Sequence, residues 1–446
     1  MCGSFGTGVK HLAEQTKMVE VNAEIGPIGL TQSRLARWSM YAVIAFPVID
    51  YTLRHVPGLS LLGSIWDKLL LVVMAALAGV RYISGYRPRW LLWHRFAGWF
   101  LLLGLAVMFA GLASLGVSVN GLKMDVYYML YAFLIPFLVA PEDVPRLLHA
   151  GAILAILIGL HGIYQYITKA PIQRGWTDVG ETVRSRVYSV LQSPNELASY
   201  MALMTPLLAG MALYETHRIR KWIYGAGVLI CGLTMLLTFT RAAWVALALA
   251  VFLMAVLFER RLLIALIVFV AVVYFLPPIH HRISDLLSPV YWIKSSQSGR
   301  IYRWVTAFDK MGTNPLFGIG TGRFGGAIAS QSYGSLYSDN YYAKIMAEMG
   351  IVGLTLFVAM HIALIRDLFR RAIQTAVGRA RYVLIGGTTG LIAMLIHNSM
   401  ENVFEFAPNV FAYFTYATLF LIWVAAPVPD AGRTKATSAK GEGGEE

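Results

Sequence analysis

The chain has 446 residues, of which 57% are hydrophobic and only 14% are charged, whereas soluble proteins carry about 25% charged residues. This composition excludes an ordinary water-soluble protein. The net charge of +13 does not call for nucleic acid, because cytoplasmic loops of membrane proteins accumulate Lys and Arg. We therefore expect a membrane-embedded chain that binds no nucleic acid.

Apolar runs long enough to cross about 30 Å of hydrocarbon as helices recur throughout the sequence. The runs are continuous rather than alternating, which excludes a barrel, so only helices can span the bilayer here. We predict an all-α polytopic membrane protein with about twelve transmembrane helices. The predicted spans are about 38–55, 66–83, 97–116, 125–140, 147–168, 196–214, 221–239, 242–258, 262–279, 340–365, 381–399 and 406–426.

Basic residues recur on alternate connections, which predicts cytoplasmic termini. The chain then divides into a cytoplasmic tail (1–37), helices one to nine (38–279), a large periplasmic loop (280–339), helices ten to twelve (340–428) and a disordered cytoplasmic tail (429–446). The two halves differ, which argues against a transporter built from internal repeats.

Two long outer connections break this charge rule, because both 169–195 and 280–339 are rich in Lys and Arg. Long loops are known to escape the rule, so a solvated loop accounts for them. Basic groups beside a membrane mouth would equally suit an anionic substrate. Arg241, in a tight apolar turn, must either reach the interface or pair with an anion.

The large loop begins with an amphipathic segment. Its polar side carries Arg300 and Arg303, three residues apart, and we expect the helix to lie at the membrane interface with its aromatic side down. The apolar face comprises Ile301, Trp304, Val305 and Phe308. The glycine-rich stretch 313–326 then predicts either a simple turn or a cradle of N–H groups for an anion.

The loop ends at the mouth of the tenth span. Ser338 or Asp339 can cap that helix, or Asp339 can act as a general base near the arginines. Within the span, Lys344 and Glu348 are four residues apart and can pair. Near the last outer turn, His397 and two glutamates form either a hydrogen-bonded cluster or a metal site, although their spacing fits no known ligand pattern.

Five segments, in this order, resemble the O-antigen ligase and polymerase superfamily of bacterial membrane glycosyltransferases. Each is loose alone, but the ordered set with one large outer loop between helices nine and ten is specific. The segments are RVYSVLQSPNELA (Arg186 to Ala198), TFTRAAW (Thr238 to Trp244), SGRIYRW (Ser298 to Trp304), NPLFGIGTGRF (Asn314 to Phe324) and DNYYAKIMAEMGIVG (Asp339 to Gly353).

The resemblance implies a GT-C-like enzyme of the bacterial inner membrane whose active site faces the periplasm. Such enzymes take a glycan from undecaprenyl pyrophosphate, without a metal or other cofactor, and arginines grip the pyrophosphate. The implied catalytic residues are Asp339, Arg241 and Arg300. The implied substrate-binding residues are Arg184, Arg186, Arg303, Arg323, Asn340, Tyr341 and Glu348.

The acceptor decides between two activities of the family: ligases use lipid A-core and polymerases use another lipid-linked repeat unit. Ligases usually carry His where this chain has Asp339, which favours an O-antigen or exopolysaccharide polymerase, with a possible chain-length regulator as partner. A ligase is the alternative. A flippase or transporter, and a scaffold without catalysis, are the rivals from other classes.

Overall fold

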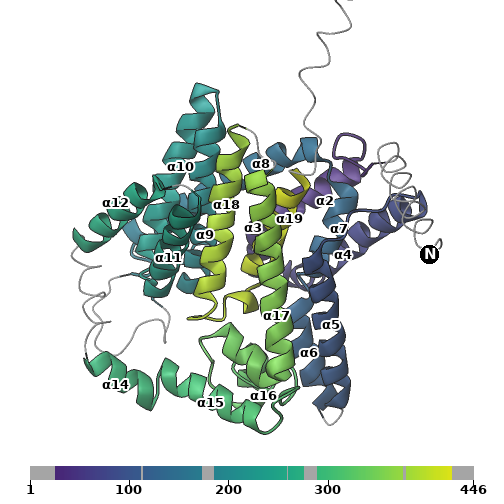
Figure 1. Ribbon diagram of the computed structural model, residues 1–446, viewed down its shortest axis with the longest axis vertical. Coiled ribbons are helices and arrows are strands. Elements are labelled where there is room, and N and C mark those ends of the chain that lie inside the picture. The colour runs from purple at the N-terminus through teal and green to yellow at the C-terminus, as the bar shows by residue number, and fades with distance from the viewer. Residues whose placement is uncertain are drawn as a thin grey trace, which may run out of the picture.

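The computed structural model describes residues 26–111, 114–172, 185–258, 260–275, 289–374 and 378–423, and the regular elements in these ranges are helices (Figure 1). They are α2 (Arg34–Ile44), α3 (Phe46–His55), α4 (Ser60–Ile83), α5 (Leu92–Ala110), α6 (Leu115–Val126), α7 (Leu130–Leu138), η2 (Pro141–Asp143), α8 (Val144–Ile167), α9 (Pro194–Tyr214), α10 (Arg218–Leu237), α11 (Arg241–Leu257), α12 (Leu262–Phe275), α14 (Pro289–Gln297), α15 (Arg300–Gly312), α16 (Ala327–Tyr333), α17 (Tyr341–Gln374), α18 (Ala380–His397), η3 (Val403–Glu405) and α19 (Ala407–Trp423).

Seven of the described helices are long and apolar enough to cross a membrane, and the bent pair α6 and α7 would make an eighth. This confirms a polytopic helical membrane protein. The other predicted spans coincide with shorter helices, namely α2 with α3, α11, α12 and α19. The count of twelve therefore stays a prediction.

Helices α9 and α18 form the buried centre of the bundle, because small residues let their backbones touch. A Cβ atom on Gly386 would lie 2.1 Å from the carbonyl oxygen of Pro206, and one on Gly390 would lie 2.4 Å from that of Leu203. Such close approach is typical of packed membrane helices. The two helices therefore form a rigid support for the polar residues at their lower ends.

Helix α17 is broken at Gly350 (φ 67°), where a straight span was expected. The glycine-rich segment fills the break: Ile319 N–H donates to the Ala347 carbonyl and Ile351 N–H to the Pro315 carbonyl, both at 2.9 Å. These bonds satisfy backbone groups that the break leaves without helical partners. These backbone hydrogen bonds thereby anchor the loop to the first turns of α17.

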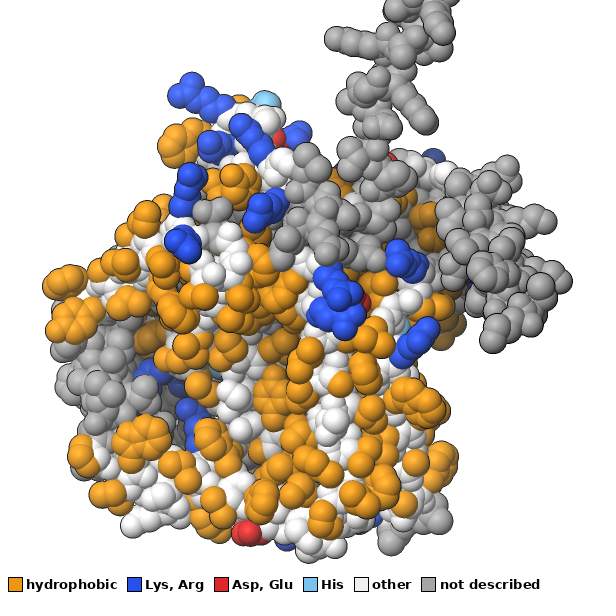
Figure 2. Space-filling view, viewed as in Figure 1, with side chains coloured by type: hydrophobic (Ala, Val, Ile, Leu, Met, Phe, Trp, Pro, Cys, Tyr) orange, Lys and Arg blue, Asp and Glu red, His pale blue; other side chains and the backbone are white. Residues whose placement is uncertain are grey.

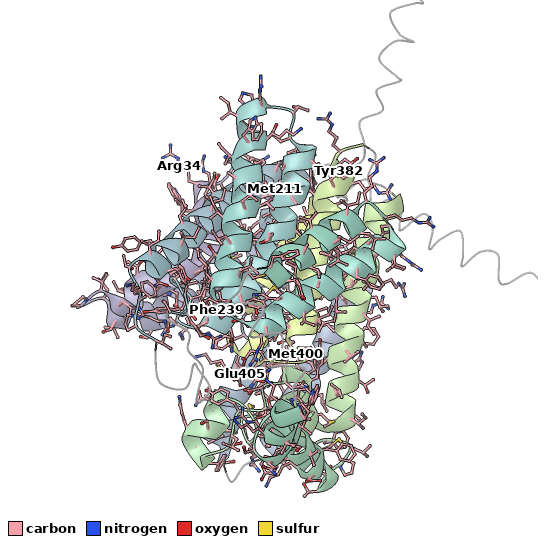
Figure 3. The ribbon with its side chains drawn as sticks, turned by 90° about the vertical axis from the view of Figure 1, so that its left-hand side faces the viewer. Arg34, Met211, Phe239, Tyr382, Met400 and Glu405 are labelled. Atoms are coloured by element: carbon pink, nitrogen blue, oxygen red, sulfur yellow. The ribbon has the colours of Figure 1, made fainter. Side chains whose placement is uncertain are left out.

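The two ends of the bundle differ in character. Figure 2 shows most visible Lys and Arg side chains over the upper part, a broad hydrophobic band below it, and a smaller basic set inside a hollow above α14 and α15. Figure 3 places Phe239, Met400 and Glu405 below Met211 and Tyr382, with Met400 and Glu405 lower than Phe239. The chain segments that carry the candidate site meet at this lower level.

Helix α15 lies across the lower end and is amphipathic, as expected. Val305 and Phe308 are exposed, whereas Ala307 is buried and Trp304 packs with it against Phe324 and α17. Trp304 was predicted to share an apolar face with Ile301, Val305 and Phe308, but it packs inward instead. The reason is that Trp304 fills a small satellite core beneath the glycine-rich segment.

Candidate active site

Arg186 is the centre of the first polar group at the lower end. It is 8% exposed, and its guanidinium donates to the Thr238 carbonyl at 2.9 Å and to Asn195 Oδ1 and Thr240 Oγ1 at 3.2 Å each. These partners lie at the end of α10 and at the starts of α9 and α11. Three helices of the bundle therefore hold one arginine in place.

Asp339 is the centre of the second group, which α15 supplies with cations. Its Oδ2 atom lies 2.5 Å from Arg303 Nη1 and 3.8 Å from Arg300 Nε. Its backbone adopts a left-handed conformation (φ 46°), which costs energy outside glycine and turns the carboxylate toward α15. The side chains of these three residues are each 22–35% exposed.

Asp339 does not cap α17, and neither does Ser338. The side chain of Asn340 accepts the Ala343 N–H at 3.1 Å, which is the geometry of an N-cap. Ser338 instead donates to Asn402 Oδ1, which also accepts the Asn340 N–H. The prediction of a Ser338 or Asp339 cap is thus wrong, since the residue after them takes that role.

Glu401, in the connection after α18, joins the two groups. Its Oε2 accepts a hydrogen bond from Asn195, the partner of Arg186. Burial and the neighbouring charge of Asp339 together raise the pKa of Glu401 to about 7, although the charge of Arg300 lowers it. Glu401 therefore contacts the Arg186 group through Asn195 and interacts electrostatically with Arg300. With this pKa it can exchange a proton near neutral pH.

The polar cluster around the last outer turn is hydrogen-bonded, which was one of its two predicted roles; the other was a metal site. His397 Nδ1 lies 2.5 Å from Ser199 Oγ, and Asn398 Oδ1 accepts the Phe404 N–H at 3.1 Å. Among the described residues, no three His, Cys, Asp or Glu side chains are arranged to hold a metal ion. These bonds fix the loop that presents Glu401.

A separate ionic cluster is buried between α6, α17 and η3. Lys344 Nζ lies 2.8 Å from both Asp125 Oδ1 and Glu348 Oε2, and 3.9 Å from Glu405 Oε1. The predicted pairing of Lys344 with Glu348 is confirmed. Burial raises the pKa of Glu405 to about 7, although the charge of Lys344 lowers it.

The ionic cluster secures the glycine-rich segment. Glu348 accepts the Phe324 N–H at 3.0 Å, Glu405 accepts the Ala327 N–H at 3.2 Å, and Gly320 N–H donates to the Glu348 carbonyl at 2.9 Å. These N–H groups are therefore occupied by protein acceptors. The arrangement favours the simple turn over an anion cradle.

Replacement of Lys344 by Met should lower the free energy of unfolding by about 3–5 kcal/mol, because the buried carboxylates would lose their cation. Thermal unfolding in detergent measures the loss. Lys123→Met is the matched control, since Lys123 is exposed on α6 two residues from Asp125. Equal stability of both variants would contradict a role for Lys344 in holding the lower end together.

The predicted site residues divide into two sets. Arg186, Arg300, Arg303 and Asp339 come together around Glu401, and half-buried Arg241 begins α11 directly after Thr240. Residues engaged elsewhere are Asn340 in its cap, Tyr341 with Asp125, Glu348 in the ionic cluster and Arg323 with Gly111 and Ser114. Arg184 lies outside the described residues.

Asn195 was not among the predicted site residues, and Glu401 and Asn402 were singled out only in the polar cluster at the last outer turn, not beside the arginines. Asn195 follows Pro194 at a helix start, and Glu401 follows a run of polar residues after α18. Both signals are equally typical of helix ends. Only the packing of α9 against α18 brings them together.

The fold and this group define a polytopic helical membrane protein with an arginine-rich polar site at one end of the bundle. Residues 226–358 match the family model Wzy_C, described as O-Antigen ligase. This match reaches from α10 into α17 and supports the resemblance to the O-antigen ligase and polymerase superfamily. No curated protein matches the chain.

Proposed function

We propose that this protein is an inner-membrane glycosyltransferase that takes a glycan from undecaprenyl pyrophosphate at the periplasmic face and passes it to a sugar hydroxyl. The observation that carries the proposal is the meeting of Arg186, Arg300 and Arg303 with Asp339 and Glu401 at one end of the bundle. This end lies opposite the main basic surface, which is the cytoplasmic side by the positive-inside rule.

The arginines suit a pyrophosphate leaving group. Negative charge develops on its bridging oxygen as the bond to the sugar breaks, and fixed cations stabilise that charge. Guanidinium groups supply planar, bidentate donors with permanent charge. Arg300 and Arg303, presented by α15 beside the membrane, are the groups that we assign to the pyrophosphate, with Arg186 and Arg241 behind them.

The acceptor hydroxyl must lose its proton to one of two carboxylates. Asp339 is held by two guanidinium groups, which favours a role in orienting them. Glu401, with a pKa of about 7, suits a general base at neutral pH. Its proton uptake accompanies formation of the new glycosidic bond while the electron pair of the old one leaves with the pyrophosphate. The proposed site residues need no metal for this step.

Replacement of Asp339 by Asn separates these roles, because it keeps the shape and removes the charge. We expect transfer to fall by about tenfold to a hundredfold as the arginines lose their charged partner. The fall should appear at every pH, since the base is elsewhere. Transfer at the wild-type rate would show that Asp339 only shapes the loop.

We favour a polymerase over a ligase because an Asp stands where ligases of the family usually carry His. A deletion strain separates the alternatives through its glycan ladder. Loss of long chains with single units still attached indicates a polymerase, whereas loss of all attached units indicates a ligase. Accumulation of lipid-linked glycan on the cytoplasmic face would instead indicate a flippase and contradict the proposal.

A further inference from the structure

A groove of about 500 Å³ runs along α17 at the outer surface of the bundle, where Ile362 is exposed. One wall is a stripe of α17, with Val358, Ile362, Ile365 and Phe369 spaced three and four residues apart. Such spacing places side chains on one face of a helix. Leu253 of α11 with Ile392 and Leu395 of α18 form the facing wall.

The groove has a charged end, and the rest of its lining is apolar apart from Tyr342 and His361. Arg366 and Arg370 continue the α17 stripe, and both are exposed. Within the described part of the chain, none of the lining side chains is acidic. The charge of the groove therefore calls for an anionic group at this end.

The charged end is remote from the candidate active site. Asp339 precedes the first turn of α17, whereas Arg370 lies in its last turns. A donor whose pyrophosphate sits at Arg300 and Arg303 would thus place its charge at the wrong end of the groove. The occupant must carry its anionic group in the opposite leaflet.

The apolar stripe of α17 that ends at the two arginines has the length of one lipid chain. From Val358 to Arg370 the helix rises about 18 Å, and one leaflet contributes about 15 Å of hydrocarbon. We propose that this groove binds an anionic phospholipid of the leaflet opposite the active site, with its phosphate between Arg366 and Arg370 and one acyl chain along α17. This inference is independent of the proposed glycan transfer.

Native mass spectrometry of the purified full-length protein tests the proposal, with phosphatidylglycerol and phosphatidylcholine added separately. We expect phosphatidylglycerol to bind the wild type more tightly than phosphatidylcholine. The double variant Arg366→Gln/Arg370→Gln should bind phosphatidylglycerol about 30-fold more weakly, since each basic residue near a lipid headgroup contributes about tenfold or less.

Two further variants make the result specific. Arg218→Gln/Lys221→Gln removes two exposed basic residues at the start of α10, outside the groove, and should bind as the wild type does. Ile362→Trp should weaken binding by obstructing the chain while both arginines remain. Equal binding of the two lipids by the wild type, full binding by the double variant, or a polyprenyl phosphate as the lipid that co-purifies in the groove would overturn the proposal.

Discussion

Replacement of Arg300 by Ala should lower the rate of glycan transfer by about 100-fold to 1,000-fold while the protein stays folded in the membrane. The loss corresponds to removing one fixed charge from the leaving group in the transition state. Arg300 is partly exposed and makes an ion pair with Asp339 at 3.8 Å. Transfer of labelled glycan by membranes that contain equal amounts of each protein measures the effect.

Lys310→Ala is the matched control, because Lys310 lies on the same helix and is exposed. It should transfer glycan at the wild-type rate. Arg241→Ala should behave like Arg300→Ala, since Arg241 begins α11 beside the Arg186 group. Full activity of both arginine variants would contradict the proposal that these arginines bind the pyrophosphate.

Replacement of Glu401 by Gln should lower transfer by about 100-fold to 10,000-fold, the range of a general base. The wild-type rate should rise with pH and level off above about 7, as Glu401 loses the proton that burial helps it retain. The variant should lose this limb of the pH profile, because an amide does not titrate. Asp339→Asn should keep the limb but move it to lower pH, because the charge of Asp339 helps to raise the pKa of Glu401.

Stability gives an independent readout of Glu401. A carboxyl whose pKa is raised in the folded state stabilises the fold below its unfolded pKa, and this contribution is lost as pH rises through the folded value. For Glu401 the window lies between 4.5 and about 7. The Gln variant should lose less stability across this window than the wild type. An unchanged rate and an unchanged pH profile in Glu401→Gln would show that Glu401 only supports the loop.

The helical membrane fold could be predicted because long apolar runs allow few other structures. Local sequence did not predict the break in α17, since Gly350 within an apolar run is typical of a packed membrane helix. The break depends on the inserted segment, whose carbonyls and N–H groups replace the helical partners. Such a long-range exchange leaves no periodic signal.

The sequence predicted the arginines of the candidate site better than its acidic residues. Arg186, Arg300 and Arg303 stood out because positive charge is unusual in outer connections. Glu348 and Arg323 also stood out as charged residues, but both are used inside the protein. The position of Glu401 depends on how α18 meets α9, which only tertiary packing determines.

The central claim is tested most directly with purified protein in liposomes, supplied with undecaprenyl pyrophosphate-linked glycan and an acceptor glycan. The account predicts that wild-type protein joins the two and releases undecaprenyl pyrophosphate, that Arg303→Ala barely does so, and that Lys310→Ala does so fully. Movement of the lipid-linked glycan across the bilayer without joining, or equal transfer by the wild type and Arg303→Ala, would contradict it.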